Sequence, residues 1–382
     1  MTGGGLSTYA LELSEALVKR GLDAILLGVG KISSSRTLRY ETLPHVKGFN
    51  IFMEPFVWNA SIGASASRIL QSSSVDIVHC VYPALVPFIN LRKAVVCSGW
   101  FSPHNLWMRL ATSIRMSSFN LSKMTELYGQ AEYFLLDELG YKKSERIFAV
   151  TKTLEEGLRR RFGDKVQYLP PGIKLHTDIN SKKKDKVLVA CIAADLENPR
   201  KGVSYFLRAL NLIEPSLLKR IEVWLIGNYA HKIENEVQML RRRGILSIKL
   251  LGYIPRASVL EYLSHIDLLV CPSLYEEFGY VMLEAMGAGI PILATKIRPL
   301  TDIAVHGVSG FFYNKGNIRE LSLLISTLVS DDVMRRKMGE EARKRILKEF
   351  NWDTISQKLE NYYKEILDSF HFTDRITMGA ST

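Results

Sequence analysis

Short apolar runs rich in β-branched residues alternate with amphipathic segments along most of the chain. Apolar runs bounded by turn residues are typical of strands buried on both faces, whereas longer segments with apolar residues at helical spacing are typical of helices. The alternation therefore predicts an α/β fold with parallel, doubly wound sheets. The predicted strands span residues 23–30, 76–83, 93–100, 146–152, 165–171, 186–194, 221–228, 247–254, 267–273, 291–295 and 310–314.

One polar stretch interrupts this alternation. The sequence HTDINSKKKDK follows the turn YLPPGIKL, and the strand–helix pattern resumes at Lys186. A polar, charged segment of this kind indicates a linker, here over residues 174–185. We therefore expect two Rossmann-like domains, residues 1–175 and 176–348, with a ligand-binding cleft between them. Beyond residue 316 the pattern is only helical, and a last helix is expected over residues 349–370.

The beginning of the chain departs from the usual order of a doubly wound domain. Such a domain opens with a strand and then a Gly-rich turn. This chain has three glycines at positions 3–5, directly before the helical segment LSTYALELSEALVKRG. We therefore expect either that the first strand is absent from this sequence or that the N-terminal sheet is one strand short. The segment is not expected to be a signal peptide, because Glu12 and Glu15 interrupt its apolar part.

Composition and charge narrow the class of protein. Apolar residues make up 47% of the 382 residues and charged residues 23%, which excludes disordered and collagen-like chains. The formal net charge of +11 is spread over both halves, without a single basic arm. Such a surface favours anionic partners, so we expect peripheral contact with an anionic membrane. Nucleic acid is not expected as a partner, because no motif for reading it is present.

The cysteines point to a reducing compartment. Cys80, Cys97, Cys191 and Cys271 each lie within a predicted strand, with no C-x-x-C motif and no zinc-like spacing. Four buried thiols are therefore expected. No apolar run reaches the length of a membrane span. The expected location is the cytoplasm, with peripheral contact at the inner face of the membrane.

The segment PSLYEEFGYVMLEAMGAGIP, residues 272–291, carries the clearest candidate chemistry. A predicted strand ends at Ser273, and a loop and a helix follow, so the loop lies at the carboxyl end of the sheet. The N–H groups at such a helix start are suited to phosphate. Glu276 in the loop and Glu284 in the helix can each accept hydrogen bonds from sugar hydroxyls. Alternatively, both are surface acids that the helix dipole stabilises.

This segment resembles the donor-site signature of a large family of retaining glycosyltransferases with the GT-B fold. The family includes bacterial mannosyltransferases, sucrose-phosphate synthases and glycogen synthases. Its signature has two glutamates eight positions apart, preceded by Pro-Ser, with Phe-Gly between them and Glu-Ala-Met-x-x-Gly-x-Pro at the end. Glu276 and Glu284 match the two glutamates, whereas Glu277 stands where the family usually has Gly. A match of this length is specific.

The resemblance implies roles for individual residues. Lys201, in NPRKGVSYFLRAL, would stabilise the leaving diphosphate with help from Arg200, and Glu276 would position the hydroxyls of the donor sugar. Glu284 would hold the ribose. The remaining donor-binding positions implied by the family motifs are Phe278, Gly279, Tyr280 and Ile254, together with Gly4 and Gly5 of the amino-terminal glycine loop. The last helix would return to the N-terminal, acceptor-binding domain.

The chain departs from the family pattern at three places. The family usually has an Arg shortly before the Lys, where this chain has Asp195 or Leu196. A His is common near the end of the strand over 93–100, where this chain has Ser98 and Gly99. The Gly-Gly-x-x-Glu that usually follows the strand over 291–295 is here RPLTD, with Asp302 at the acidic position. Elsewhere, His79 is expected to be a hydrogen-bonded core residue.

The resemblance implies a retaining hexosyltransferase that uses a nucleotide-activated sugar. The acceptor would be a glycan, a lipid-linked glycan or a small molecule. No cofactor and no metal are expected, because no Asp-x-Asp lies on a loop after a predicted strand and Lys201 can meet the phosphate charge. The alternative is a non-catalytic nucleotide-sugar-binding or partner subunit of the same fold, which the missing Arg and the missing first strand would suit.

Overall fold

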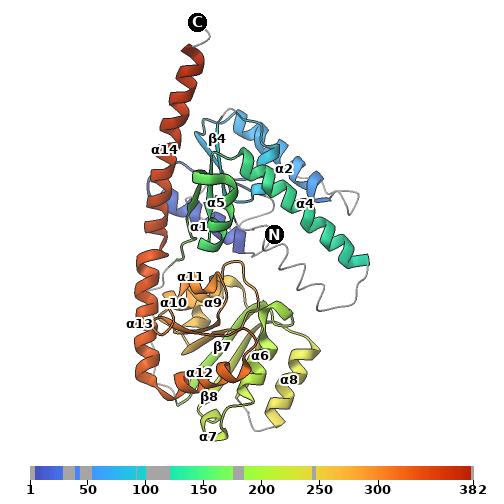
Figure 1. Ribbon diagram of the computed structural model, residues 1–382, viewed down its shortest axis with the longest axis vertical. Coiled ribbons are helices and arrows are strands. Elements are labelled where there is room, and N and C mark those ends of the chain that lie inside the picture. Colours follow the sequence, from blue (N-terminus) through green and yellow to red (C-terminus); the bar gives the residue numbers. More distant parts are fainter. Residues whose placement is uncertain are drawn as a thin grey trace. The chain divides into compact units, whose positions relative to one another are not determined.

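The computed structural model describes residues 5–28, 39–43, 54–91, 93–99, 121–174, 185–242 and 247–379 (Figure 1). The chain forms two compact units. Unit 1 comprises Met1–Gly172 and Trp352–Thr382, and unit 2 comprises Ile173–Asn351. The chain therefore passes from one unit to the other twice. These passages lie three residues from the domain limits expected at 175/176 and 348/349.

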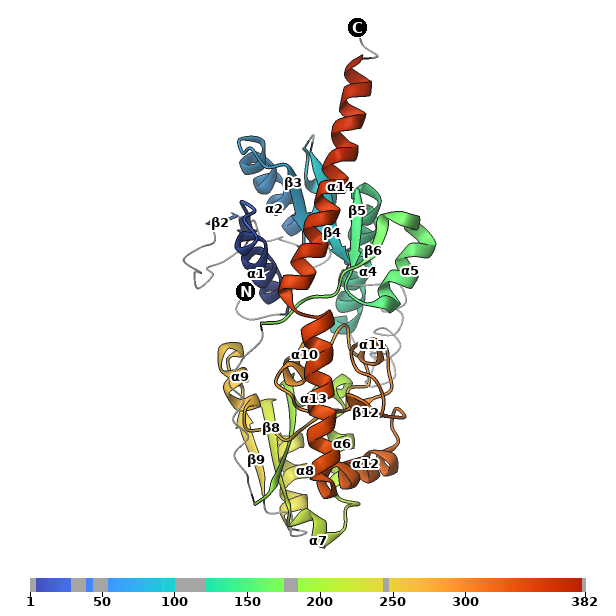
Figure 2. The same ribbon diagram turned by 90° about the vertical axis from the view of Figure 1, so that its left-hand side faces the viewer.

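Unit 2 is built on a six-stranded parallel sheet with the order β12-β11-β10-β7-β8-β9. Strands β8, β9 and β12 of this sheet are labelled in Figure 2. Counted from the first strand of the unit, this order is 6-5-4-1-2-3, the order of a dinucleotide-binding Rossmann sheet. The strands are β7 (Val187–Asp195), β8 (Ile221–Asn228), β9 (Ile248–Gly252), β10 (Leu268–Cys271), β11 (Ile292–Thr295) and β12 (Gly310–Tyr313). The near-continuous burial of β7, β10 and β11 explains the uninterrupted apolar runs in their sequences.

Helices connect and cover these strands. The main core of unit 2 combines strand residues such as Val189 and Leu225 with the apolar face of α6, including Phe206 and Leu210. Burial of such side chains stabilises the unit by about 1.5–3 kcal/mol each. The helical elements are η3 (Pro199–Lys201), α6 (Val203–Leu210), α7 (Pro215–Leu218), α8 (His231–Arg242), α9 (Arg256–Leu263), α10 (Tyr280–Gly287), α11 (Leu300–Ile303), α12 (Ile318–Ser330) and α13 (Asp332–Glu349).

Unit 1 contains a four-stranded parallel sheet, β3-β4-β5-β6, and a separate parallel pair, β1-β2. The strands are β1 (Ile25–Gly28), β2 (Arg39–Thr42), β3 (Ile77–Cys80), β4 (Ala94–Gly99), β5 (Arg146–Ala149) and β6 (Val166–Tyr168). The helical elements are α1 (Gly5–Lys19), α2 (Glu54–Gln71), η1 (Pro83–Phe88), α4 (Leu121–Lys143), α5 (Lys152–Phe162), η2 (Gly163–Lys165) and α14 (Trp352–Gly379).

The last helix, α14, belongs to unit 1 because it packs on α1. The indole N–H of Trp352 donates to Glu12 at 2.9 Å, and the Trp352 ring lies 5.8 Å from that of Tyr9. Gly172 lies against the same indole, where a Cβ would come within 2.6 Å of it. Arg20, the residue after α1, pairs with Glu360 of α14.

Most sequence predictions about elements agree with the structure. The segment 310–314, predicted as a strand, forms β12 and pairs in parallel with β11. Strand β2 was not predicted, because RYET lacks an apolar run. Lys201 lies in the short helix η3, two residues before α6.

The four cysteines are buried and free, as predicted, in β3, β4, β7 and β10.

None of the described helices is long and apolar enough to cross a membrane.

Candidate active site

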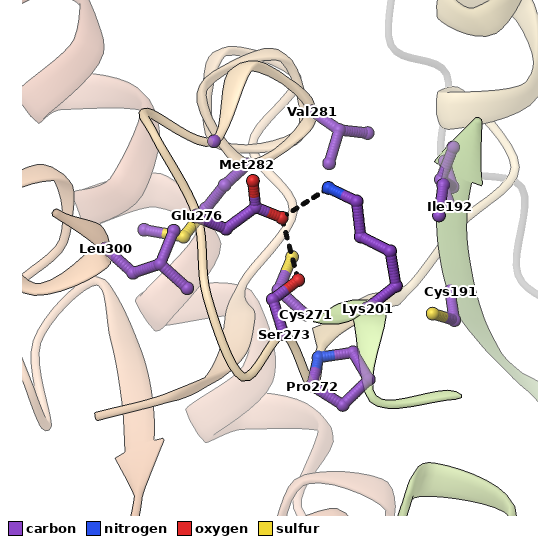
Figure 3. Close-up of a pocket in the computed structure, with 12 residues that line it drawn as sticks. Cys191, Ile192, Lys201, Cys271, Pro272, Ser273, Glu276, Val281, Met282 and Leu300 are labelled. Carbon is purple, nitrogen blue, oxygen red and sulfur yellow. Dashed lines mark hydrogen bonds and ion pairs between the residues drawn. The ribbon is translucent and has the colours of Figure 1, made fainter. Parts of the chain in front are cut away.

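The candidate site lies at the carboxyl ends of β7 and β10, which are neighbours in the sheet of unit 2. The strand order reverses between these two strands, since the chain proceeds from β7 toward one edge and from β10 toward the other. At such a point the two following loops diverge and leave a crevice, where ligands of doubly wound sheets bind. Figure 3 shows the hollow there, with Lys201 on one loop and Glu276 on the other.

The hollow has a mostly apolar lining. Its charged lining residues, among those that the structure describes, are Lys201 and Glu276. The lining comprises Cys191, Ile192, Ala193, Lys201, Cys271, Pro272, Ser273, Glu276, Gly279, Val281, Met282 and Leu300. Burial raises the pKa of Cys191 to about 12, so this residue is a neutral thiol in the wall.

The backbone holds the two loops of the site together. The N–H of Leu274 donates to the carbonyl of Arg200 at 2.7 Å. Gly202 adopts φ 65°, and a Cβ there would come within 2.0 Å of the carbonyl oxygen of Pro272. Only glycine satisfies both conditions, because it tolerates positive φ and has no Cβ. The position of Lys201 relative to the loop after β10 is therefore set by main-chain contacts.

Lys201 and Glu276 form an ion pair inside the hollow. The ammonium Nζ of Lys201 donates to Oε1 of Glu276 at 2.6 Å. The side chains are 29% and 17% exposed, so water screens the pair less than it would a surface pair. The hydroxyl of Ser273 donates to the same Oε1 at 2.7 Å. A lysine ammonium thus lies in a mostly apolar hollow with a carboxylate that a serine hydroxyl contacts from a second direction.

The first turn of α10 also faces the hollow, through Gly279 and Val281. Gly279 has φ 101°, and a Cβ there would come within 2.8 Å of Leu300. This close approach explains the Phe-Gly of the sequence motif. The first N–H groups of a helix have no intrahelical acceptor, and they suit a phosphate.

The chain was compared with known families and solved structures. Residues 3–177 match the family described as Glycosyltransferase Family 4, and residues 174–345 match the family described as Glycosyl transferases group 1. The chain belongs to the group 1 glycosyltransferases. An uncharacterized glycosyltransferase of Methanocaldococcus jannaschii is 24% identical, with 94% of each chain covered.

Solved structures of similar proteins bear out the GT-B fold of this glycosyltransferase. Sucrose-phosphate synthase from Thermosynechococcus elongatus superposes with a TM-score of 0.74 at 17% identity, covering 96% of this chain and 94% of the other. HepE of Anabaena, in complex with UDP and glucose, gives a TM-score of 0.67 at 18% identity, covering 94% and 96%.

Among the described residues, the other motif residues of the glycosyltransferase do not line the hollow. Phe278 is buried, and its ring lies 5.2 Å from that of Tyr280. Glu284 is buried in α10, with 8% of its surface exposed. Ile254 is half-buried in the loop after β9. Gly5 is the first residue of α1 in unit 1, and Gly4 lies outside the described residues.

The residues near the usual Arg position are engaged elsewhere in the glycosyltransferase. The guanidinium of Arg200 lies 5.7 Å from the centre of the Tyr275 ring. Asp195 accepts a hydrogen bond from the N–H of Glu197 at 2.9 Å and is exposed. Leu196 is buried. Asp195 therefore stabilises the turn after β7, and its recorded hydrogen bond in the described structure is not to Lys201.

His79 of unit 1 is half-buried and hydrogen-bonded at both ring nitrogens, in keeping with the predicted structural role. Its Nδ1 is bonded to the hydroxyl of Tyr363 at 2.6 Å and its Nε2 to the hydroxyl of Ser98 at 2.8 Å. Ser98 is bonded in turn to Tyr9 at 3.0 Å. Burial lowers the pKa of His79 to about 3, so the ring is neutral at physiological pH.

Ser273 is the site residue whose role sequence reasoning missed. It was noted only as part of the Pro-Ser that precedes the first glutamate. The spacing of three residues between Ser273 and Glu276 was the available signal, because a loop that turns back can bring such positions together.

Proposed function

We propose that this glycosyltransferase transfers a hexose from a nucleotide-activated sugar to a glycan, lipid or small-molecule acceptor, with retention of configuration. The observation that carries the proposal is the Lys201–Glu276 pair beside the start of α10, at the reversal point of a Rossmann sheet. A cation and free N–H groups suit a diphosphate, and a carboxylate suits sugar hydroxyls. The diphosphate and the sugar of a nucleotide sugar need these two kinds of group.

The residues then have distinct roles. As the bond between the sugar and the diphosphate oxygen breaks, the electron pair stays on that oxygen, and the Lys201 ammonium stabilises the charge. Glu276 orients the sugar through its hydroxyls. The acceptor oxygen forms the new bond from the same face, and its proton passes to the departing diphosphate. Lys201, the α10 start and Arg200 meet the phosphate charge without a metal ion.

The nucleotide end of the donor would be bound by residues outside the lining of the hollow. Glu284 would accept hydrogen bonds from the ribose, and the backbone at Ile254 would contact the base. Backbone N–H groups at Phe278 and Gly279 would contact sugar and phosphate. The complex of the similar HepE with UDP and glucose supports a nucleotide-sugar donor.

Nucleotide release tests this proposal. The purified protein is incubated with a panel of nucleotide sugars and extracted acceptors, and release of nucleoside diphosphate is followed with and without excess chelator. We expect release with at least one donor, unaffected by chelator, and a product with the anomeric configuration of the donor. Binding of a nucleotide sugar without turnover would favour the non-catalytic alternative. Loss of activity in chelator, restored by Mn²⁺ or Mg²⁺, would contradict metal independence.

We also propose that unit 1 contacts an anionic membrane through α4 and α5. Leu135 and Leu139 lie one turn apart on α4 and are 60% and 50% exposed. The next turn of α4 carries exposed Lys142, and α5 carries exposed Arg159 and Arg160. Apolar side chains flanked by cations suit an interface with acidic lipids.

Vesicle co-sedimentation tests the membrane contact. We expect binding to vesicles with anionic phosphatidylglycerol and little to pure phosphatidylcholine. Leu135→Ser with Leu139→Ser should weaken binding, whereas Leu212→Ser with Met239→Ser, which changes exposed apolar residues of unit 2, should not. Equal binding by both double variants would exclude this surface.

Four buried free thiols support a cytoplasmic location.

A further inference from the structure

We infer that Ser273 is a positioning residue that turns the Glu276 carboxylate so that Oε2 alone is offered to the donor sugar. This inference rests on the proposed function and specifies how the site selects a sugar hydroxyl. The relevant contacts are in Figure 3, where one oxygen of Glu276 receives both hydrogen bonds and the other points away from both donors.

The first step of the argument is the sharing of one oxygen. Oε1 of Glu276 accepts from Lys201 at 2.6 Å and from Ser273 at 2.7 Å. A carboxylate oxygen has about two lone-pair positions, so Oε1 is saturated. Within the described residues, no donor is recorded for Oε2. A sugar hydroxyl that donates to Glu276 is therefore directed to Oε2.

The second step separates Ser273 from Lys201. The terminal torsion of a glutamate side chain is broad, so one bond to a long, flexible lysine fixes the carboxylate plane poorly. Ser273 is 4% exposed, has a short side chain and directly follows Pro272 at the end of β10. The Lys201 ammonium has three N–H donors, so it can contact a diphosphate while it keeps its bond to Oε1. The Ser273 hydroxyl is then the bond that fixes the orientation of Glu276.

The expected result for Ser273→Ala is a selective kinetic defect. A hydrogen bond to a charged group is lost, so kcat should fall about tenfold. The affinity for free nucleoside diphosphate, measured by calorimetry, should not change, because that part of the ligand does not contact Glu276. The KM for the nucleotide sugar should change less than kcat.

Deoxy donors make the test specific. With a donor that lacks the hydroxyl bound by Oε2, wild type and Ser273→Ala should turn over equally. With donors deoxygenated elsewhere, the tenfold difference should persist. A general loss of folded protein would lower turnover equally for every donor, and that outcome would overturn the inference.

Two variants complete the design. Ser273→Thr keeps the hydroxyl and should restore most of the turnover. Ser309→Ala removes another buried serine hydroxyl of unit 2, which accepts from the N–H of Val305 at 2.8 Å, and it should leave turnover near wild type. Calorimetric stoichiometry with nucleoside diphosphate reports the folded fraction of each variant. Wild-type turnover in a folded Ser273→Ala would overturn the inference.

Failure of the proposed function gives a different result. A wild-type protein that neither binds nor cleaves any nucleotide sugar would contradict the function, and the geometry would still be testable by amine acetylation followed by mass spectrometry. With Ser273 present, Lys201 faces a fixed carboxylate and reacts slowly. In Ser273→Ala we expect severalfold faster labelling of Lys201 relative to exposed Lys219. An unchanged ratio would overturn the inference.

Discussion

Lys201 is the residue whose substitution tests the chemistry of the site most directly. Its charge acts mainly when the diphosphate departs, so removing it should lower kcat more than it raises KM. We predict that Lys201→Ala and Lys201→Met each lower kcat about a hundredfold or more, corresponding to ~3 kcal/mol. Steady-state kinetics on both variants is the measurement. Turnover near wild type in Lys201→Ala would remove the catalytic role and favour a binding subunit.

Asp195 gives a second prediction at the same scale. Asp195 accepts a hydrogen bond from the N–H of Glu197, so we expect it to stabilise the turn after β7. We also expect its negative charge to weaken phosphate binding slightly. Asp195→Arg should therefore keep or raise kcat/KM, and Asp195→Asn, which retains an acceptor for the turn, should stay near wild type. A large loss in Asp195→Arg with a normal Asp195→Asn would show that the carboxylate orients a cation of the site.

Glu284 is predicted to contribute to nucleotide binding rather than to the rate of sugar transfer. Glu284→Ala should weaken binding of the cognate nucleoside diphosphate, because a ribose diol loses its acceptor. Calorimetric titration measures this directly. Since Glu284 is buried, a thermal melt must accompany the titration, and an unchanged affinity in a folded variant would remove Glu284 from the site.

At the scale of elements, the beginning of α14 is held in unit 1 by Trp352. Its indole packs near Tyr9 and Gly172 and donates to Glu12. We predict that Trp352→Ala costs about 3–5 kcal/mol of the stability of unit 1, since a large buried ring is deleted. Hydrogen exchange should then speed up in β3–β6 but not in β7–β12. Equal acceleration in both sheets would contradict an effect confined to unit 1.

At the scale of the whole molecule, the pH dependence of stability follows from a buried carboxyl of α4. Burial raises the pKa of Asp137 from 3.8 to about 7, and a bond from the N–H of Ala84 opposes this only partly. The folded protein therefore binds this proton more tightly than the unfolded chain does. The stability due to the bound proton is present at acid pH and is lost as pH rises toward 7.

Asp137→Asn removes the buried charge and retains an acceptor. We predict that it raises the Tm at pH 8 by roughly 5 °C or more, with a much smaller effect near pH 4. Melting curves of wild type and variant across this pH range are the measurement. A destabilised variant at pH 8 would show that the carboxylate is better satisfied in the fold than its burial implies.

Local sequence was sufficient for the elements and for the main chemical groups. Apolar runs mark strands such as Val187–Asp195 because a strand covered on both faces has no solvent side for polar residues. Lys201, Glu276 and Gly279 were predictable because each lies beside the element that positions it, within a specific motif. The strand β2 escaped prediction because its polar residues lack that signal.

Only the tertiary structure decided how these parts meet. The strand order places β7 beside β10, so that Lys201 reaches a carboxylate 75 positions away. Packing within unit 1 brings Ser98 and Tyr363 to the two nitrogens of His79, and Trp352 to Gly172. Ser273 lies only three residues from Glu276, yet its hydrogen bond depends on how the loop turns back. Hydrophobic pattern is a property of each segment alone, whereas partners across a sheet are set by packing among segments distant in sequence.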